Sequence, residues 1–269
     1  MKQFFWLVVF LTICAFADEQ QKTYPIIKNE SFSRGEVLEY RVNFGFLTIG
    51  KAITKVDAKS HIINARPCYK IDAFGETTSI SWIYKVKDNW GAYIDTAAMV
   101  THVSYRKIRE NSYRKDEQVV YDHNLKKARV RVMNKETGVY ENTKEFDITE
   151  NATDLVGGFI QLRFLDFSKV KLGDTLSIHG FFEDTSYNLK ILYKGRQTVS
   201  TSLGKIPCHL LVPVMPDNKL FNGPNSIRVW ISDDQNRIPV KIQAKMFIGH
   251  TGVELTNFRG LRNQLRIIP

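Results

Sequence analysis

Apolar and polar residues alternate along much of this chain with a period of two. Leu38, Tyr40 and Val42 would share one face of an extended strand, with charged or amide side chains between them. The same alternation recurs in three further segments, 82–87, 127–132 and 227–231. This period is typical of antiparallel strands with one buried face and one face open to solvent or ligand. The sequence therefore predicts a mainly β protein.

The same order of sequence landmarks occurs twice along the chain. Four landmarks occur in the same order in both copies. They are Gly35-Glu36-x-Leu38 (Gly173-Asp174-x-Leu176 in the second copy), Gly50-Lys51 (Gly195-Arg196), Pro67-Cys68 (Pro207-Cys208) and Asp95 (Asp234). Such self-similarity predicts an internal duplication, with antiparallel sheets curved into an open barrel or two half-barrels. The alternative is that glycine turns between unrelated strands resemble one another.

One segment breaks the alternation. Leu155, Phe159 and Leu162 recur at the spacing i, i+4, i+7, which predicts a single helix near 153–165 with Thr153 as its N-cap. These three residues form the apolar face of the predicted helix. We expect that face either to pack in the core or to cover a ligand groove.

Two adjacent glycines, Gly157 and Gly158, lie inside the predicted helix. Each weakens a helix by about 1 kcal/mol relative to alanine, so tertiary packing must hold it. Glycines at this place would let the helix lie close against a sheet.

The N-terminus has the features of a secretory signal peptide. Lys2 precedes an apolar run, 4–16, and Ala15-Phe16-Ala17 is a small-x-small cleavage site before the polar Asp18. The run is too short for the alternative, a membrane anchor. We expect cleavage before Asp18 and a soluble protein of the periplasm or outer-membrane periphery, without a transmembrane segment.

These boundaries divide the chain into five parts. They are a signal peptide (1–17), an N-terminal extension (18–33), a first β repeat (34–148), a helix with its connection (149–171) and a second β repeat (172–269). Hydrophobic residues make up 43% of the chain, which is enough for a core and excludes global disorder.

The chain is basic, with a formal net charge of +10, and its basic residues concentrate between 105 and 135. Lys127, Arg129 and Arg131 share one face of a predicted strand. Nucleic acid is a poor partner for a secreted protein, so anionic lipid head groups or acidic glycans are the candidate contacts. The alternative is a solvated outer face.

Motifs for catalysis or cofactor binding do not emerge from the sequence. The six histidines are scattered, without metal-ligand spacing. Asp233-Asp234 fits a hairpin turn better than a calcium site. Cys68 and Cys208 could form a disulfide in an oxidising compartment, although a domain of this size does not require one. No cofactor and no metal are predicted.

The residues also resemble a bacterial family of secreted proteins catalogued as domain of unknown function 3108. The resemblance rests on four stretches, Gly35-Glu36-x-Leu38-x-Tyr40, Asp154-Leu155 to Leu162-Arg163, 203–208, and Val229 to Asp234 with 237–240. The matching motif residues are Gly35, Glu36, Asp154, Arg163 and Asp234. Gly157-Gly158 departs from the small polar residues expected there. The resemblance implies an all-β cell-envelope protein and supplies no established activity.

The leading hypothesis is a non-enzymatic envelope protein that binds an apolar or lipid-like ligand, such as an acyl chain, in a concave sheet. The candidate lining residues are Trp82, Tyr84, Trp90, Tyr93, Phe159 and Trp230. The same aromatic residues could be ordinary core. The second hypothesis is a protein-interaction module of an envelope or surface assembly, and an enzyme is the third.

Overall fold

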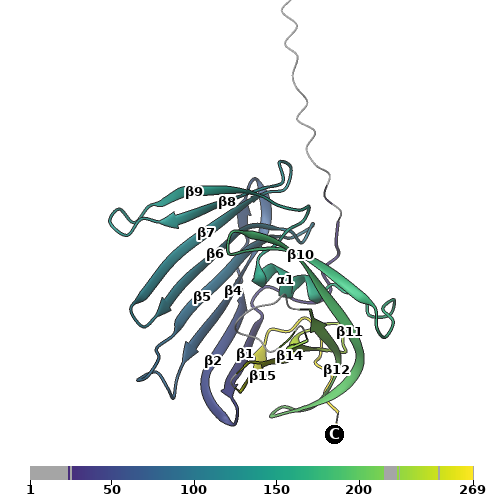
Figure 1. The fold of residues 1–269 in the computed structure, drawn as a ribbon. Coiled ribbons are helices and arrows are strands. Elements are labelled where there is room, and N and C mark those ends of the chain that lie inside the picture. The colour runs from purple at the N-terminus through teal and green to yellow at the C-terminus, as the bar shows by residue number, and fades with distance from the viewer. Residues whose placement is uncertain (1–23, 25, 215–222, 224, 248, 269) are drawn as a thin grey trace, which may run out of the picture.

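The computed structural model describes residue 24, residues 26–214, residue 223 and residues 225–247 and 249–268. The predicted signal peptide, 1–17, lies outside these residues. Within them the chain forms fifteen strands, all in one antiparallel sheet, and one helix (Figure 1).

The first nine strands precede the helix. They are β1 (Val37–Phe44), β2 (Leu47–Val56), β3 (His61–Ile63), β4 (Arg66–Thr77), β5 (Lys87–Asp95), β6 (Thr101–Glu110), β7 (Tyr113–Asp122), β8 (Lys127–Met133) and β9 (Tyr140–Asp147). The helix and the remaining strands are α1 (Leu155–Leu162), β10 (Thr175–Phe182), β11 (Thr185–Thr201), β12 (Gly204–Pro213), β13 (Ile227–Ser232), β14 (Pro239–Lys245) and β15 (His250–Arg259).

The sheet is a long meander that curls around α1 (Figure 1). Its strand order is β10-β11-β12-β13-β14-β15-β1-β2-β4-β5-β6-β7-β8-β9, and β3 pairs with β4 outside this path. The second half of the chain thus joins the first through β15 and β1. The edges of the sheet are β9 and β10, and it does not close. This confirms the predicted mainly β fold with an open barrel.

The strand order within the two halves is the same. The path β1-β2-β4-β5-β6-β7 matches β10-β11-β12-β13-β14-β15, whereas β3, β8 and β9 have no counterpart. Gly35 and Gly173, which precede the first strand of each half, both have a positive φ, +83° and +92°. The internal duplication and the five-part division of the chain stay predictions.

The concave face of β4 and β5 is apolar and carries the helix. Ile71, Ala92 and Ile94 lie on that face and pack against Val156 and Ile160 of α1. The burial of these residues supplies the tertiary packing that a helix with two glycines needs. No helix in the described part of the chain is long and apolar enough to cross a membrane.

The start of α1 differs from the prediction by one residue. The N-cap is Asp154, whose carboxylate accepts hydrogen bonds from the backbone N–H groups of Val156 at 3.0 Å and Gly157 at 3.1 Å. Thr153 cannot cap, because its backbone forms a bridge to the edge strand β10 at Gly180. Its N–H donates to His179 and its carbonyl accepts from Phe181.

Of the two alternatives for the apolar helix face, packing in the core holds for only one of its three residues. Leu155 is 46% exposed and Phe159 is 38% exposed, whereas Leu162 is buried. The physical reason is Gly157, which faces the sheet. A Cβ atom there would clash with the Thr153 hydroxyl and lie 2.5 Å from Oγ1 of Thr101. This close approach turns Leu155 and Phe159 away from the sheet.

The candidate disulfide is absent. Cys68 on β4 and Cys208 on β12 are both free and buried. Each thiol donates to the carbonyl two residues earlier on its own strand, Arg66 for Cys68 and Ile206 for Cys208. Five strands separate β4 from β12 in the sheet, so equivalent positions in the two halves do not bring the sulfur atoms together.

The two helix glycines make a matched pair for testing this packing. Gly158→Ala should raise the free energy of unfolding by up to about 1 kcal/mol, because alanine favours the helix and the nearest atoms to the new Cβ are 3.9 Å away. Gly157→Ala should lower it by about 1–3 kcal/mol through overpacking. Urea unfolding of both variants measures the difference, and equal effects would contradict the close approach.

Candidate functional site

A cavity opens on the concave face between the start of α1, strands β5 to β7 and the end of β10. Its apolar lining is Trp90, Val119, Leu155, Phe181 and Phe182. Its polar lining is Ser104, Tyr105, Arg106, Glu117, Asp154, Glu183 and Asp184. Seven of the twelve lining residues are polar, and the cavity is small, about 30 Å³, against the roughly 300–1,000 Å³ of most small-molecule sites.

Arg106 is the cation of this cavity. Its Nε donates to Glu117 at 2.6 Å, and its Nη1 donates to Glu183. The guanidinium lies over two rings, 5.8 Å from the centroid of Trp90 and 5.1 Å from that of Phe182. Burial lowers the pKa of Arg106, but the hydrogen bonds to Glu183 and Glu117 outweigh it and raise the pKa overall. The side chain therefore stays charged.

The turn between β10 and β11 covers one side of the cavity. Glu183 and Asp184 at this turn both have a positive φ, +48° and +60°. Glu183 pairs with Arg106 of β6, and Asp184 lies 3.3 Å from Nζ of Lys144 on β9. Two ion pairs and the stacked rings of Trp90 and Phe182, 5.7 Å apart, thus hold this turn across the gap between the sheet edges.

The helix contributes an apolar surface beside the cavity. Leu155 lines it directly, and Phe159 lies one turn further along the same face. Both side chains are substantially exposed, whereas Val156 and Ile160 on the opposite side are buried. The exposed side of α1 is therefore apolar, which is unusual for a surface helix.

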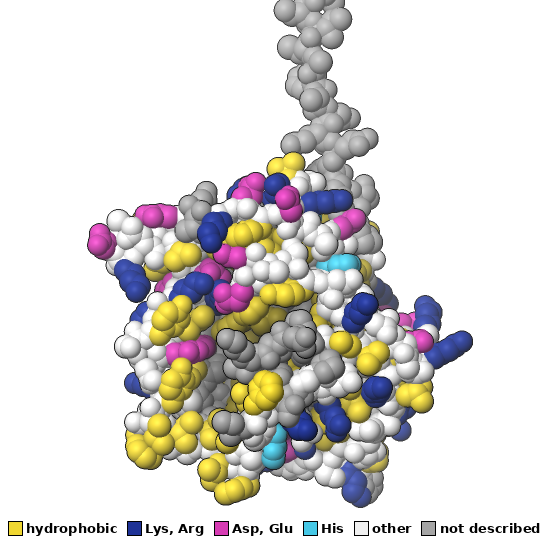
Figure 2. Space-filling view, in the orientation of Figure 1, with side chains coloured by type: hydrophobic (Ala, Val, Ile, Leu, Met, Phe, Trp, Pro, Cys, Tyr) yellow, Lys and Arg dark blue, Asp and Glu magenta, His cyan; other side chains and the backbone are white. Residues whose placement is uncertain are grey.

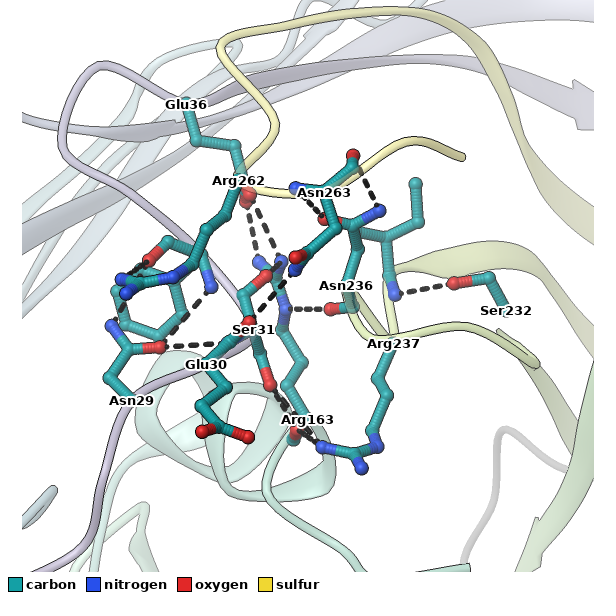
Figure 3. A network of polar contacts seen from close by, with 12 residues as sticks. Asn29, Glu30, Ser31, Glu36, Arg163, Ser232, Asn236, Arg237, Arg262 and Asn263 are labelled. Atoms are coloured by element: carbon teal, nitrogen blue, oxygen red, sulfur yellow. Dashed lines mark hydrogen bonds and ion pairs between the residues drawn. The ribbon is translucent and has the colours of Figure 1, made fainter. Parts of the chain in front are cut away.

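A second polar cluster, which we call the Arg163 clasp, fixes the other end of the helix (Figure 3). Arg163 is buried and forms a bidentate ion pair with Glu36 at 2.5 and 3.0 Å. Its guanidinium also donates to the carbonyls of Ser31 at 2.8 Å and Asn236 at 2.9 Å. One side chain thus joins the helix to the start of β1, the N-terminal segment and the β13–β14 turn.

Two of the remaining motif residues, Gly35 and Asp234, lie beside this clasp, whereas Asp154 caps the opposite end of the helix. Asp234 shapes the β13–β14 turn, because its Oδ1 accepts the N–H groups of Asn236 and Arg237. Gly35 precedes Glu36 and donates its N–H to the Val56 carbonyl. Asp233 to Asn236 form the turn that the sequence predicts. The geometry of these residues is that of a structural joint, in which each polar group is occupied by the protein itself.

The structure separates the predicted ligand-lining aromatic residues. Trp90 lines the cavity and Phe159 lies beside it. Trp82 and Tyr84 lie in the β4–β5 loop at the end of the sheet, because residues 79–84 form turns in place of the expected strand. Tyr93 lies on the convex face near His61 and Tyr105. Trp230 is buried in the core, where its Nε1 donates to Gln197.

The three basic residues expected to meet head groups are engaged by neighbouring strands. Lys127 pairs with Asp147 at 2.9 Å. Arg129 contacts Glu145 at 3.2 Å and Asp122 at 3.4 Å. Arg131 donates to the Gln118 amide oxygen. Cross-strand carboxylates thus compensate the charges of Lys127 and Arg129, whereas Arg131 meets a neutral amide. A contact of these residues with anionic head groups stays a prediction.

Two buried His–Asp pairs resemble parts of a hydrolytic site. His102 lies 3.2 Å from Asp95, which also binds Arg66 and caps the following turn. His209 lies 2.8 Å from Asp233, and its ring stacks on Phe167 with centroids 3.9 Å apart. Burial lowers the pKa of both histidines although the aspartates oppose it. Both pairs are built into the packing of the sheet.

The sequence analysis missed the residues that shape the cavity. Arg106 belongs to the basic window between 105 and 135 but points to the concave side, where Trp90 and Glu117 are its register partners on β5 and β7. Phe182 and Glu183 come from the other half of the chain. The signal that could have identified this cavity is a row of aromatic, basic and acidic residues across three strands, Trp90, Arg106 and Glu117. This row becomes visible only once the strands are aligned in register.

Comparison with known proteins gives a family and a fold. A family model described as "Protein of unknown function (DUF3108)" matches residues 39–256. No curated protein matches the chain in sequence. The crystal structure of a β-barrel-like protein of domain of unknown function DUF1849 from Brucella abortus is similar, with a TM-score of 0.56 and 9% identity over 85% of this chain and 98% of that one. This likeness supports the open barrel.

A second solved structure is less similar. It is described as "a putative lipoprotein from Parabacteroides distasonis" and shares 10% identity over 88% of this chain and 100% of that one, with a TM-score of 0.32.

The Arg163 clasp should dominate the stability of the fold. Arg163→Met leaves the Glu36 carboxylate buried and unpaired, so we expect the free energy of unfolding to fall by about 3–5 kcal/mol. The matched control is Arg129→Met, which breaks an exposed pair with Glu145 and should cost less than about 1 kcal/mol. Urea unfolding measures both, and similar losses would contradict the assignment.

The N-cap carboxylate should make stability depend on pH. Burial raises the pKa of Asp154 from 3.8 to about 6, against the hydrogen bonds from Gly157 and Val156. Between these values the folded state holds a proton that the unfolded state has released, so this group's contribution to stability falls as pH rises. Asp154→Asn keeps a capping oxygen and cannot ionise. Its stability relative to the parent protein should increase by about 2–3 kcal/mol from pH 4 to 7 in urea unfolding, and a constant difference would contradict the raised pKa.

Proposed function

The chain belongs to the DUF3108 family of proteins of unknown function, and we propose that it is a non-enzymatic envelope protein that holds an apolar, lipid-like ligand on the concave face of its sheet. The observation that carries the proposal is the exposed apolar side of α1. Leu155 lines a cavity together with Trp90, Phe181 and Phe182, and Phe159 lies one turn further along the exposed side of the helix. An acyl chain on this surface would bury these side chains.

The charges of the cavity suit a ligand with an anionic head group. Arg106 is held from two sides, by the buried Glu117 and by Glu183 on an exposed turn. A phosphate or carboxylate could replace Glu183 at the guanidinium while Glu117 stays in place, because arginine pairs readily with either group. Displacing Glu183 would loosen the β10–β11 turn and open the cavity.

Export to the envelope rests on the N-terminal residues. The positive start, the apolar run and Ala15-Phe16-Ala17 predict cleavage before Asp18. A periplasmic or outer-membrane location would supply lipids and lipid-modified proteins as ligands. N-terminal sequencing of envelope material should find Asp18 first, and an intact Met1 would contradict export by this signal.

The two alternative functions receive less support. A module that adds a partner strand needs an accommodating sheet edge. The edge strand β9 carries Glu141, Lys144, Glu145 and Asp147, which are typical of edges protected from pairing. The other edge strand, β10, is covered at Gly180 by the backbone of Thr153. An enzyme would need reactive groups open to a substrate, and the two His–Asp pairs are committed to the packing of the sheet.

Two neighbouring helix residues separate ligand binding from folding. Phe159→Ala should cost little stability because the side chain is 38% exposed, and it should weaken binding of a fluorescent fatty acid by about tenfold, since burying a phenylalanine contributes about 1.5–3 kcal/mol. Ile160→Ala is the control. It removes a buried side chain and should cost about 2–5 kcal/mol of stability.

Thermal melting and probe titration of both variants measure these effects. A large loss of melting temperature in Phe159→Ala together with unchanged probe binding would refute the proposal. Native mass spectrometry of protein purified from its own envelope should also show a bound lipid.

A further inference from the structure

Large apolar side chains gather at one end of the sheet. We call this set the aromatic rim, and it comprises Phe44, Phe46, Leu47, Trp82, Ile83, Tyr84, Tyr113 and Phe247, all of them exposed. Phe46 is 95% exposed and Trp82 is 83% exposed. Figure 2 shows hydrophobic side chains along the lower left edge of the molecule, over the strand tips that Figure 1 places there. Scattered single residues are normal on a surface, but a contiguous group is a sign of function.

The topology places these residues on successive loops of one edge. Alternate connections of an antiparallel meander lie at the same end of the sheet, and β14–β15, β1–β2, β4–β5 and β6–β7 are four such connections in spatial order. Although no hairpin joins β15 to β1, the pairing of Phe44 with Thr251 brings the β14–β15 and β1–β2 tips together.

Backbone hydrogen bonds tie each loop to the next. Gly45 donates to the His250 carbonyl at 2.9 Å, and Thr78 donates to the Ile49 carbonyl at 2.9 Å. Asn111 donates to the Lys85 carbonyl at 2.8 Å. The aromatic rim is therefore a continuous, pre-organised edge, in which each loop is hydrogen-bonded to its neighbour.

The charge on the rim is almost entirely positive. The rim segments 44–51, 78–87, 110–115 and 245–250 contain six lysines and arginines and a single carboxylate, Glu110. The Glu110 carboxylate accepts a hydrogen bond from the Tyr84 hydroxyl at 2.9 Å. The cations are Lys51, Lys85, Lys87, Arg114, Lys115 and Lys245, of which Lys51 pairs with Glu76 at 2.7 Å and Lys115 with Glu117 at 2.6 Å.

We propose that the aromatic rim docks the protein on the interface of an anionic lipid bilayer. Aromatic rings with lysine and arginine between them are the composition that favours the head-group region, where rings enter the acyl boundary and cations meet phosphates. The rim follows the curved edge of a sheet, so its side chains form a row of tips that can insert side by side. This role is independent of the cavity and its ligand.

The test uses the protein as recovered after export and vesicles of phosphatidylcholine with or without phosphatidylglycerol. The unmodified protein should bind the mixed vesicles and bind pure phosphatidylcholine more weakly. The double variant Phe46→Ser with Trp82→Ser should lose at least about tenfold in partitioning, because two exposed rings no longer enter the lipid. Lys85→Gln with Lys245→Gln should reduce binding to the mixed vesicles and leave binding to pure phosphatidylcholine unchanged.

The matched control is Leu125→Ser, which changes a residue that is 66% exposed in the β7–β8 turn at the opposite end of the sheet. It should bind like the unmodified protein. All variants share the same N-terminal residues and alter exposed side chains, so equal melting temperatures confirm that the comparison isolates the rim. Trp82 supplies a direct signal, since its fluorescence should shift to the blue on vesicle binding and this shift should vanish in Trp82→Phe.

Three results would overturn the proposal. They are rim variants that bind as well as Leu125→Ser, an unmodified protein that does not distinguish the two vesicle types, and a rim that captures a protein partner while the protein ignores vesicles. Loss of fatty-acid binding in Phe159→Ala with vesicle binding intact would bear on the cavity alone.

Discussion

The buried ion pair between Arg163 and Glu36 is the constraint on which the arrangement of this fold depends. A guanidinium withdrawn from water must have its hydrogen bonds satisfied, and here the partners come from segments far apart in the sequence, at Glu36, Ser31 and Asn236. The end of α1, the entry to β1 and the β13–β14 turn can therefore take only one relative position. Four of the five family motif residues, Gly35, Glu36, Arg163 and Asp234, lie at this joint.

Fixing the helix at its C-terminal end decides what its N-terminal end presents. Gly157 allows contact with Thr101 and Thr153, and the buried side chains of Val156 and Ile160 settle on β4 and β5. Leu155 is left facing the cavity beside Trp90 and Phe182, and Phe159 stays exposed one turn further along. The apolar surface of the helix is thus exposed for two reasons. The Arg163 clasp fixes the orientation of the helix, and Gly157, which has no side chain, lets the opposite side of the helix approach the sheet.

The sequence predicts the parts of this fold that periodicity encodes. Alternation finds the strands of β1, β8 and β13, and the i, i+4, i+7 spacing finds the helix. It cannot find which side of the helix is buried, because the decisive feature is the absence of a side chain at Gly157. Nor can it place Trp82, where the chain turns although the alternation continues. Arg106 and Glu183 meet only through the curvature of a sheet, which no local pattern records.

The pairing of β15 with β1 has a consequence for the order of folding. Val37 lies opposite Arg259, so this register joins residues from opposite ends of the described chain. Contacts of such long range form slowly, since a large loop must close before they stabilise anything. The sheet cannot be completed until the last strand has emerged from the ribosome, and a nascent chain that ends before residue 250 exposes β1 and β14 as open edges.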